Sequence, residues 1–317
     1  VFGDVILNGG ATPLVIGGEK PQSAGSGVET NVLAKIRSTN KASVARATVL
    51  ESAETGDSFQ LRIQDESVLT GEVTKTTPGV GARTRVVCFG VLHKLKQAQV
   101  DVTFDAVSAT AALRQLSSAV GFDIKFQVQP TETISTSFKQ KPADEIVSKI
   151  TKLTDTITVV SPDNKLILTD AKTVGQTFNL SRIIDASPGS RRPQYESVQV
   201  IGNTPTAKRG LQARHLISSQ PVLAEAGDGQ PSFIYEDDSI TSQTQANNTA
   251  QKLLKRLKKQ QKGGFAAVIG RPEIRPFDTV VFPPAQGGST FTVSEVTHKI
   301  TENEGFITRL KLGGELT

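Results

Sequence analysis

The chain has a single cysteine, no tryptophan, only two tyrosines and no long apolar run. One thiol, Cys88, excludes an internal disulfide, so burial and hydrogen bonds must hold the fold together. Because Cys88 lies in an apolar segment with a strand-like pattern, we expect it to be buried rather than reactive. No stretch of about 18 apolar residues occurs, so a membrane-spanning helix is not expected and the chain is predicted to be soluble.

Catalytic and metal-binding patterns are also missing. The chain has only three histidines: His93, His215 and His298. None of them has a histidine or cysteine at ligand spacing, so we expect no metal and no cofactor. Glu225, Asp237 and Asp238 are candidates for the paired carboxylates of sugar hydrolysis, but their polar setting favours solvated charge. With no nucleophile or phosphate-binding motif either, we expect no enzymatic activity and no small-molecule substrate.

Length and charge set the remaining bounds. A chain of 317 residues exceeds one typical core and is expected to divide into two or three domains. The 36 basic and 31 acidic residues leave a net charge of +5, which is too small to indicate a nucleic-acid partner by itself. The places where charge clusters are more informative.

The first region, residues 1 to 104, has the pattern of a β structure. Phe59, Leu61 and Ile63 alternate with polar residues, which predicts a strand with one buried face. Residues 68–73 and 83–89 predict further strands, separated by turn clusters. Several short strands at this spacing predict a small antiparallel barrel or sandwich.

The second region, residues 105 to 172, changes to an α+β pattern. A helix is predicted after Ser108 as N-cap, ending at Gly121, and a second helix opens at Pro142. Short alternating segments between and after the helices predict strands. The expected order is strand, helix, strand, strand, helix, strand, strand in one compact module.

The third region, residues 173 to 317, returns to β structure around one long helix. We expect a connecting β-rich and loop domain at 173–235, then a domain at 236–317. A helix is predicted at 241–262, ended by Gly263 and Gly264. Strands are predicted at 279–282, 291–300 and 305–312, the last two as a hairpin. The alternation slips by one residue near Ser294, which predicts a β-bulge there.

The sharpest charge feature is a basic run near the end of the long helix. Its members are Lys252, Lys255, Arg256, Lys258, Lys259 and Lys262, with no acid between them. A solvated helix face explains them, since cations complement the negative end of the helix dipole. A contact with an acidic partner or with nucleic acid is the functional alternative, so these residues are a candidate interface.

The final strands carry a resemblance to a known family. The segments Gly270–Phe282, Phe291–Ile300 and Gly305–Leu312 resemble the closing strands of hub proteins from phage tails and contractile injection machines, including late control D proteins. Nearer the N-terminus, residues 56–73 and 85–95 are similar to the first strands of that family. One departure is Phe277, which stands where the family commonly has glycine before the aspartate of a turn.

This resemblance implies a mainly β fold with an α+β insertion, built on two small antiparallel β-barrels of the tail-hub type. It implies a homotrimeric structural hub without catalytic turnover, in which six barrels approximate sixfold symmetry. Such a ring joins a hexameric tail tube to a trimeric central spike, with other baseplate or wedge proteins and a tape measure protein as further partners. The implied location is the tail baseplate of a virion assembled in the host cytoplasm.

Two alternatives remain open at this point. The middle region, with Val107–Leu113 and Gly121–Ile124, is also similar to the small periplasmic domains of secretins. In that case the protein is a binding module of a secretion apparatus. A wall-degrading tail enzyme is the other alternative. Neighbouring genes for tube, sheath and spike would favour the hub over the secretion module, whereas pilus or secretion genes would favour the module.

Overall fold

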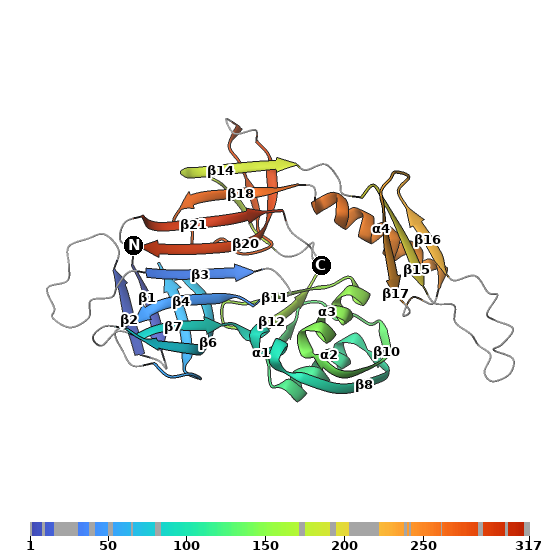
Figure 1. Ribbon diagram of the computed structural model, residues 1–317, viewed down its shortest axis with the longest axis horizontal. Helices are drawn as coiled ribbons and strands as arrows, with labels where there is room; N and C mark the ends of the chain where they lie inside the picture. The colour runs from blue at the N-terminus through green and yellow to red at the C-terminus, as the bar shows by residue number, and fades with distance from the viewer. Residues whose placement is uncertain are drawn as a thin grey trace, which may run out of the picture. The chain divides into compact units, whose positions relative to one another are not determined.

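The computed structural model describes residues 2–7, 10–15, 31–37, 42–49, 53–64, 66–79, 84–170, 175–190, 195–202, 222–237, 240, 242–260, 262–284, 288–301 and 304–313. The chain divides into two compact units (Figure 1). Unit 1 consists of Val1–Pro188 with Gly264–Thr317, and unit 2 consists of Gly189–Gly263. No helix in the part of the chain that is described is long and apolar enough to cross a bilayer.

One 13-stranded sheet dominates unit 1. Its first seven strands are β1 (Phe2–Leu7), β2 (Gly10–Val15), β3 (Asn31–Arg37), β4 (Val44–Val49), β5 (Ser58–Ile63), β6 (Glu66–Pro78) and β7 (Thr84–Phe89). Its other six are β13 (Thr177–Asn179), β14 (Ile183–Ser190), β18 (Lys262–Ile269), β19 (Thr279–Val281), β20 (Thr290–Thr301) and β21 (Gly305–Leu312). The spatial order is β14-β18-β21-β20-β3-β4-β7-β6-β5-β1-β2, with β19 also pairing with β20 and β13 with β19. Strands from both ends of the sequence therefore share one sheet.

Two hydrophobic cores lie against this sheet. The first is built from the early strands and includes Phe59, Leu61 and the fully buried Cys88. Burial raises the pKa of the Cys88 thiol, which confirms the expectation of a structural cysteine. The second core is built from the late strands and includes Phe282 and Phe291. Their rings pack edge to face, with 5.6 Å between the ring centroids. Ile300 of β20 and Phe306 of β21 also belong to the first core, so the late strands contribute to both.

The predicted strands of the first and last regions are confirmed, but two closed barrels are not. The pairings between described strands follow one open path, ending at β14 and β2. The fold is mainly β with an α+β module, as expected. The predicted bulge is confirmed, because the register of β20 against β21 shifts between Val293 and Glu295. The predicted hairpin is confirmed as well, with Thr301 opposite Gly305.

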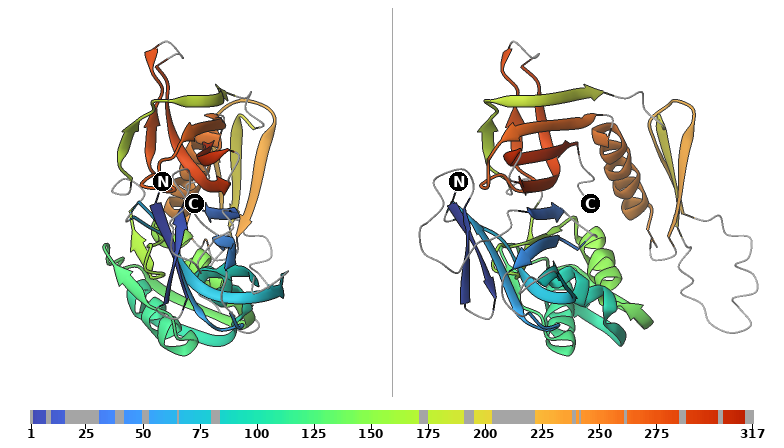
Figure 2. Two further views of the ribbon diagram at one scale, coloured as in Figure 1. Left: turned by 90° about the vertical axis from the view of Figure 1, so that its left-hand side faces the viewer. Right: turned by 60° about the vertical axis from the view of Figure 1, so that its left-hand side comes forward.

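The middle region folds in the predicted order. Its elements are β8 (Gln99–Ser108), α2 (Ala109–Val120), β9 (Ile124–Phe126), β10 (Thr133–Pro142), α3 (Ala143–Thr154), β11 (Ile157–Val160) and β12 (Leu166–Thr169). The side chain of Ser108 accepts a hydrogen bond from the Ala111 amide, and Gly121 ends α2 in the left-handed conformation. Both helices pack against the two-stranded ribbon of β8 and β10 (Figure 2). A short helix that the pattern did not reveal, α1 (Val91–Gln97), precedes the module.

Unit 2 is a small sheet with one helix on it. The strands β15 (Ser197–Gly202), β16 (Leu223–Ala226) and β17 (Ser232–Asp237) pair in the order β16-β15-β17. The helix α4 (Gln243–Gln260) packs Ala246 and Ala250 against Val198 and Val200 of the sheet. The long helix is therefore confirmed, two residues shorter at each end than predicted.

The predicted helix stop at Gly263 and Gly264 is wrong. Both glycines lie in strand β18, and the helix ends before them at Gln260. Gly264 has a φ of +131°, and a Cβ added there would meet the Ser187 carbonyl oxygen of β14 at 2.1 Å. The glycine is therefore needed where the backbones of two strands approach closely, rather than as a helix terminator.

Candidate interaction surface

The two sets of strands meet where β3 pairs with β20. Seven residue pairs form this antiparallel ladder, from Asn31 opposite Thr301 to Arg37 opposite Glu295. On one face, Ala34 and His298 are fully buried over the cores. On the other face, alternate residues of both strands point away from the cores. We call this β3–β20 junction the seam, because it makes one continuous sheet from distant parts of the sequence.

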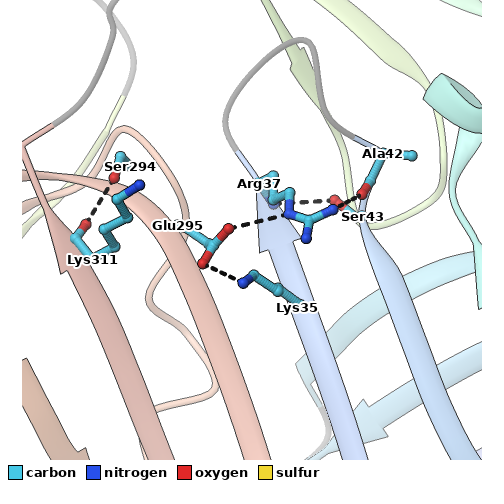
Figure 3. A network of polar contacts seen from close by, with 7 residues as sticks. All are labelled: Lys35, Arg37, Ala42, Ser43, Ser294, Glu295 and Lys311. Carbon is cyan, nitrogen blue, oxygen red and sulfur yellow. Dashed lines mark hydrogen bonds and ion pairs between the residues drawn. The ribbon is translucent and has the colours of Figure 1, made fainter. Parts of the chain in front are cut away.

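A charged network crosses the outer face of the seam (Figure 3). The carboxylate of Glu295 on β20 lies 2.8 Å from Lys35 Nζ and accepts a hydrogen bond of 3.1 Å from Arg37 Nε. Arg37 also donates from Nη1 to the Ala42 carbonyl and from its backbone amide to Ser43 Oγ. One acid of β20 therefore holds two cations of β3, and Arg37 in turn binds Ala42 and Ser43 directly before β4.

The bulge aims Glu295 at this network. Without the extra residue near Ser294, the strict alternation from Val293 would place position 295 over the core. The Ser294 hydroxyl donates to the Lys311 carbonyl at 3.1 Å and so holds the bulge closed (Figure 3). Partial burial raises the pKa of Glu295, but the hydrogen bonds from Lys35 and Arg37 outweigh it and leave the pKa below its usual value.

A second polar link joins the late chain to the early strands. Arg275 lies before β19, and its guanidinium donates to the Val68 carbonyl at 2.8 Å and to the Ser67 carbonyl. Both carbonyls belong to β6. Because Arg275 is partly buried, these bonds satisfy donors that would otherwise be costly to bury.

The turn that carries Arg275 contains the departure noted in the sequence. Phe277 has a φ of +76°, the left-handed region that glycine adopts without strain, and its side chain is buried. The backbone therefore keeps a glycine-like turn although the residue is phenylalanine. Asp278 stabilises this turn by accepting hydrogen bonds from the amides of Gln176 and Arg275. Burial raises the pKa of Asp278, partly offset by these two bonds.

His298 lies in the seam on the core side and is fully buried. Its Nδ1 lies 3.1 Å from Thr308 Oγ1, which accepts a hydrogen bond from the Arg271 amide. Nε2 has no hydrogen-bond partner among the described residues. Burial, and to a smaller extent the charge of Arg275, lowers the pKa of His298 to about 3. The imidazole is therefore a neutral packing residue.

The outer face of the sheet around the seam is basic. Its described cations on β3, β4, β7, β20 and β21 are Lys35, Arg37, Arg46, Arg85, Lys299, Arg309 and Lys311. Glu295 is the one acid among the described outward residues of these five strands. Neither positional clustering in the sequence nor net charge reveals this face, because each strand contributes only one or two of these cations.

The basic run predicted as an interface lies on α4 and at the start of β18. Lys252, Lys255 and Lys258 are exposed on the helix. The side chains of Arg256, Lys259 and Lys262 lie outside the described part of the structure. The geometry of the exposed members is compatible with the interface prediction, which stays a prediction.

The candidate metal ligands and carboxylates of the sequence analysis are the next feature of the described residues. No group of three or more potential metal ligands is present there. Glu225 accepts a hydrogen bond from Gln199, and Asp237 accepts one from the Tyr235 hydroxyl, while Asp238 and His215 lie outside the described residues. A shallow depression of about 340 Å³ beside β10 and α3 is lined by Phe138, Lys141, Lys149 and three neighbours.

Known proteins resemble this chain in structure but not in sequence. No protein-family model and no curated protein matches the sequence. The 43 kDa tail protein of prophage MuSo2 from Shewanella oneidensis superimposes with a TM-score of 0.75 at 12% identity, over 99% of both chains. The chain has the fold of phage tail proteins. The tail protein from Neisseria meningitidis MC58 agrees, with a TM-score of 0.74 at 12% identity over 99% of this chain and 96% of that one.

The same tail-protein fold occurs in a secretion machine. A component of the Escherichia coli type VI secretion system, c3393, matches with a TM-score of 0.55 at 8% identity. The match covers 93% of this chain and 76% of that one. That protein is described as structurally similar to the T4 bacteriophage tail proteins gp27 and gp5. These likenesses establish the fold and extend over nearly the whole chain.

Proposed function

We propose that the chain is the structural hub of a phage tail baseplate, or of a related contractile injection machine. Three copies form a ring that adapts a hexameric tail tube to a trimeric central spike. The observation that carries this proposal is the seam, which joins two sets of strands into one sheet with a broad and continuous outer face. Stacked rings need such extended, repeated surfaces rather than one deep cleft.

The two hydrophobic cores support the symmetry adaptation. We assign residues 1–104 and 236–317 to two related hub barrels, with 105–172 as the inserted module and 173–235 as the connecting domain. One core lies mainly under the early strands and the other under the late strands, with Ile300 and Phe306 of the late strands completing the first. Two such domains in each of three copies place six similar bodies around a threefold axis, which is what a sixfold partner requires.

The partners follow from this role. The tail tube contacts one side of the ring and the spike the other, with wedge, other baseplate and tape measure proteins nearby. The particle location is the virion tail baseplate. The solved structures with this fold are tail and secretion-machine components, which supports structural work without turnover. In this assembly the basic residues Lys252, Lys255, Arg256, Lys258, Lys259 and Lys262 contact an acidic partner surface.

Sedimentation of the purified chain, alone and with its tube and spike proteins, tests the proposal. A trimer that co-sediments with both partners, with threefold density in electron micrographs, is the expected result. A chain that stays monomeric at high concentration and binds neither partner would refute the hub role. Clearing of purified peptidoglycan by the isolated chain would instead favour the wall-degrading alternative.

A further inference from the structure

Exposed apolar side chains gather on two sheet faces of this chain. Six large hydrophobic residues are more than 40% exposed among the described residues. Five of them lie on β14, β18, β16 and β17: Ile184, Phe265, Ile269, Leu223 and Ile234. The sixth, Leu153, lies on α3. Single exposed apolar residues need no explanation, but clustered ones mark interaction sites.

The first cluster lies at the β14 end of the basic sheet in unit 1. Phe265 and Ile269 of β18 stand opposite Lys311 and Ile307 of β21 on the outer face. Ile184 of β14 joins them, because its neighbour Ile183 packs against the core on the opposite face. Between these rows Arg309 faces outward beside Ala267. We call this surface the basic face; it has an apolar centre next to exposed cations.

The second cluster covers the outer face of the small sheet in unit 2. One row across its strands consists of Leu223, Ile201 and Glu236, and the next consists of Glu225, Gln199 and Ile234. The strands carry no lysine or arginine. The opposite side of this sheet is covered by α4, whereas Leu223 is 43% and Ile234 57% exposed. We call this surface the acidic face.

We propose that the acidic face of one copy docks on the basic face of the next copy around the ring. The two faces have complementary charge and each has an apolar centre, the composition of a specific protein interface. A second copy is the occupant that these observations favour, since every copy carries one face of each kind. Such a head-to-tail contact uses two different surfaces per copy and forms a ring of three when each copy is rotated by a third of a turn from the last. The inference rests on the proposed trimer and names the surfaces that build it.

Charge reversal with rescue tests this pairing. One variant carries Glu225→Lys with Glu236→Lys, and the other carries Arg309→Glu with Lys311→Glu. Each places like charges across the contact and is expected to raise the concentration at which half of the chains are trimeric by at least about tenfold. The chain that combines all four changes has opposite charges again, so its trimerisation is expected to return to within about threefold of the wild-type value. Equilibrium sedimentation at low salt, where charge effects are least screened, measures all four proteins.

Two controls make the result specific. Lys125→Glu with Lys139→Glu changes the net charge as much as the Arg309 and Lys311 pair, on exposed sites of the middle module, and is expected to leave the trimer unchanged. Phe265→Ser with Ile234→Ser removes the apolar centres at exposed positions and is expected to weaken the trimer by at least about tenfold without loss of fold. This second variant also decides the matter if a charge-reversed chain does not fold.

The outcomes separate the two proposals. A wild-type trimer that is weakened by both reversals and restored by the combination supports the docking. A wild-type trimer that is insensitive to the reversals and to the serine variant overturns the docking, because another surface or another tail protein then covers these faces, while the hub role stands. A wild-type chain that remains monomeric overturns both the trimer and the docking.

Discussion

Acid should destabilise unit 1 through one buried imidazole. His298 is fully buried, has a pKa of about 3 in the folded chain and titrates near 6.5 when unfolded. The unfolded chain therefore binds a proton at this site between these two values, and the folded chain does not. The free energy of unfolding is unaffected by His298 above about pH 7.5 and falls as the pH drops through 6.5 toward 3. Below 3 both states are protonated and the loss stops growing.

The magnitude follows from the gap between the two pKa values. Each pH unit within the gap corresponds to about 1.4 kcal/mol, so a fall to pH 5.0 costs roughly 2 kcal/mol of the unfolding free energy through His298 alone. His298→Asn keeps an amide nitrogen near the position of Nδ1, which faces Thr308, but removes the titration. The variant is expected to be less stable at pH 7.5, because the smaller side chain leaves a cavity. Between pH 7.5 and pH 5.0 its free energy of unfolding should fall by roughly 2 kcal/mol less than that of the wild type.

Urea unfolding followed by far-ultraviolet circular dichroism at the two pH values measures this difference. Tyrosine fluorescence is unsuitable, since both tyrosines, Tyr195 and Tyr235, belong to unit 2. Other titrating groups cancel in the comparison between variant and wild type. His93→Asn is the matched control for the loss of a histidine, because His93 stacks on Phe89 outside the seam. Equal losses for the wild type and His298→Asn would refute the reasoning.

Substitutions at three further positions test the two links between the sets of strands and the turn beside one of them. Glu295→Gln should lower the unfolding free energy at pH 7 by only about 1 kcal/mol, because the ion pairs of Glu295 with Lys35 and Arg37 are partly exposed. The difference between variant and wild type should vanish as the pH falls below the usual glutamate range, where Glu295 becomes protonated. A urea midpoint that the variant leaves unchanged at pH 7 would contradict this. Arg275→Met leaves two carbonyls of β6 without their donor and should lower the free energy of unfolding by about 2 to 4 kcal/mol in the same urea titration. Arg275→Lys should lower it by less, and equal losses for the two variants would argue against the paired bonds. Phe277→Gly and Phe277→Ala both remove the buried ring. The glycine variant should be the more stable of the two by about 1 kcal/mol, because glycine adopts the positive φ of this position without strain. The reverse order of stability would argue against that backbone conformation.

Local signals in the sequence were sufficient for most elements. Ser108 and Gly121 bound a helix because a cap and a left-handed glycine act within one turn of the chain. The slip in alternation near Ser294 placed the bulge, since strand faces follow a period of two residues. The family resemblance of the last strands led to the tail-protein fold that the structural comparisons bear out. The strand in which Gly264 lies was missed because the contact that demands glycine comes from β14, far away in the sequence.

The sequence by itself determined which face of each predicted strand is buried and where α2 begins and ends, because these depend on neighbours a few positions away. Tertiary structure alone decided that β3 pairs with β20 and that Glu295 meets Arg37 across 258 positions. Alternation tells which side of a strand is buried, but it is silent about which strand lies alongside. The basic and acidic faces arise in the same way, because each strand supplies only a few of their residues and the sheet brings them together.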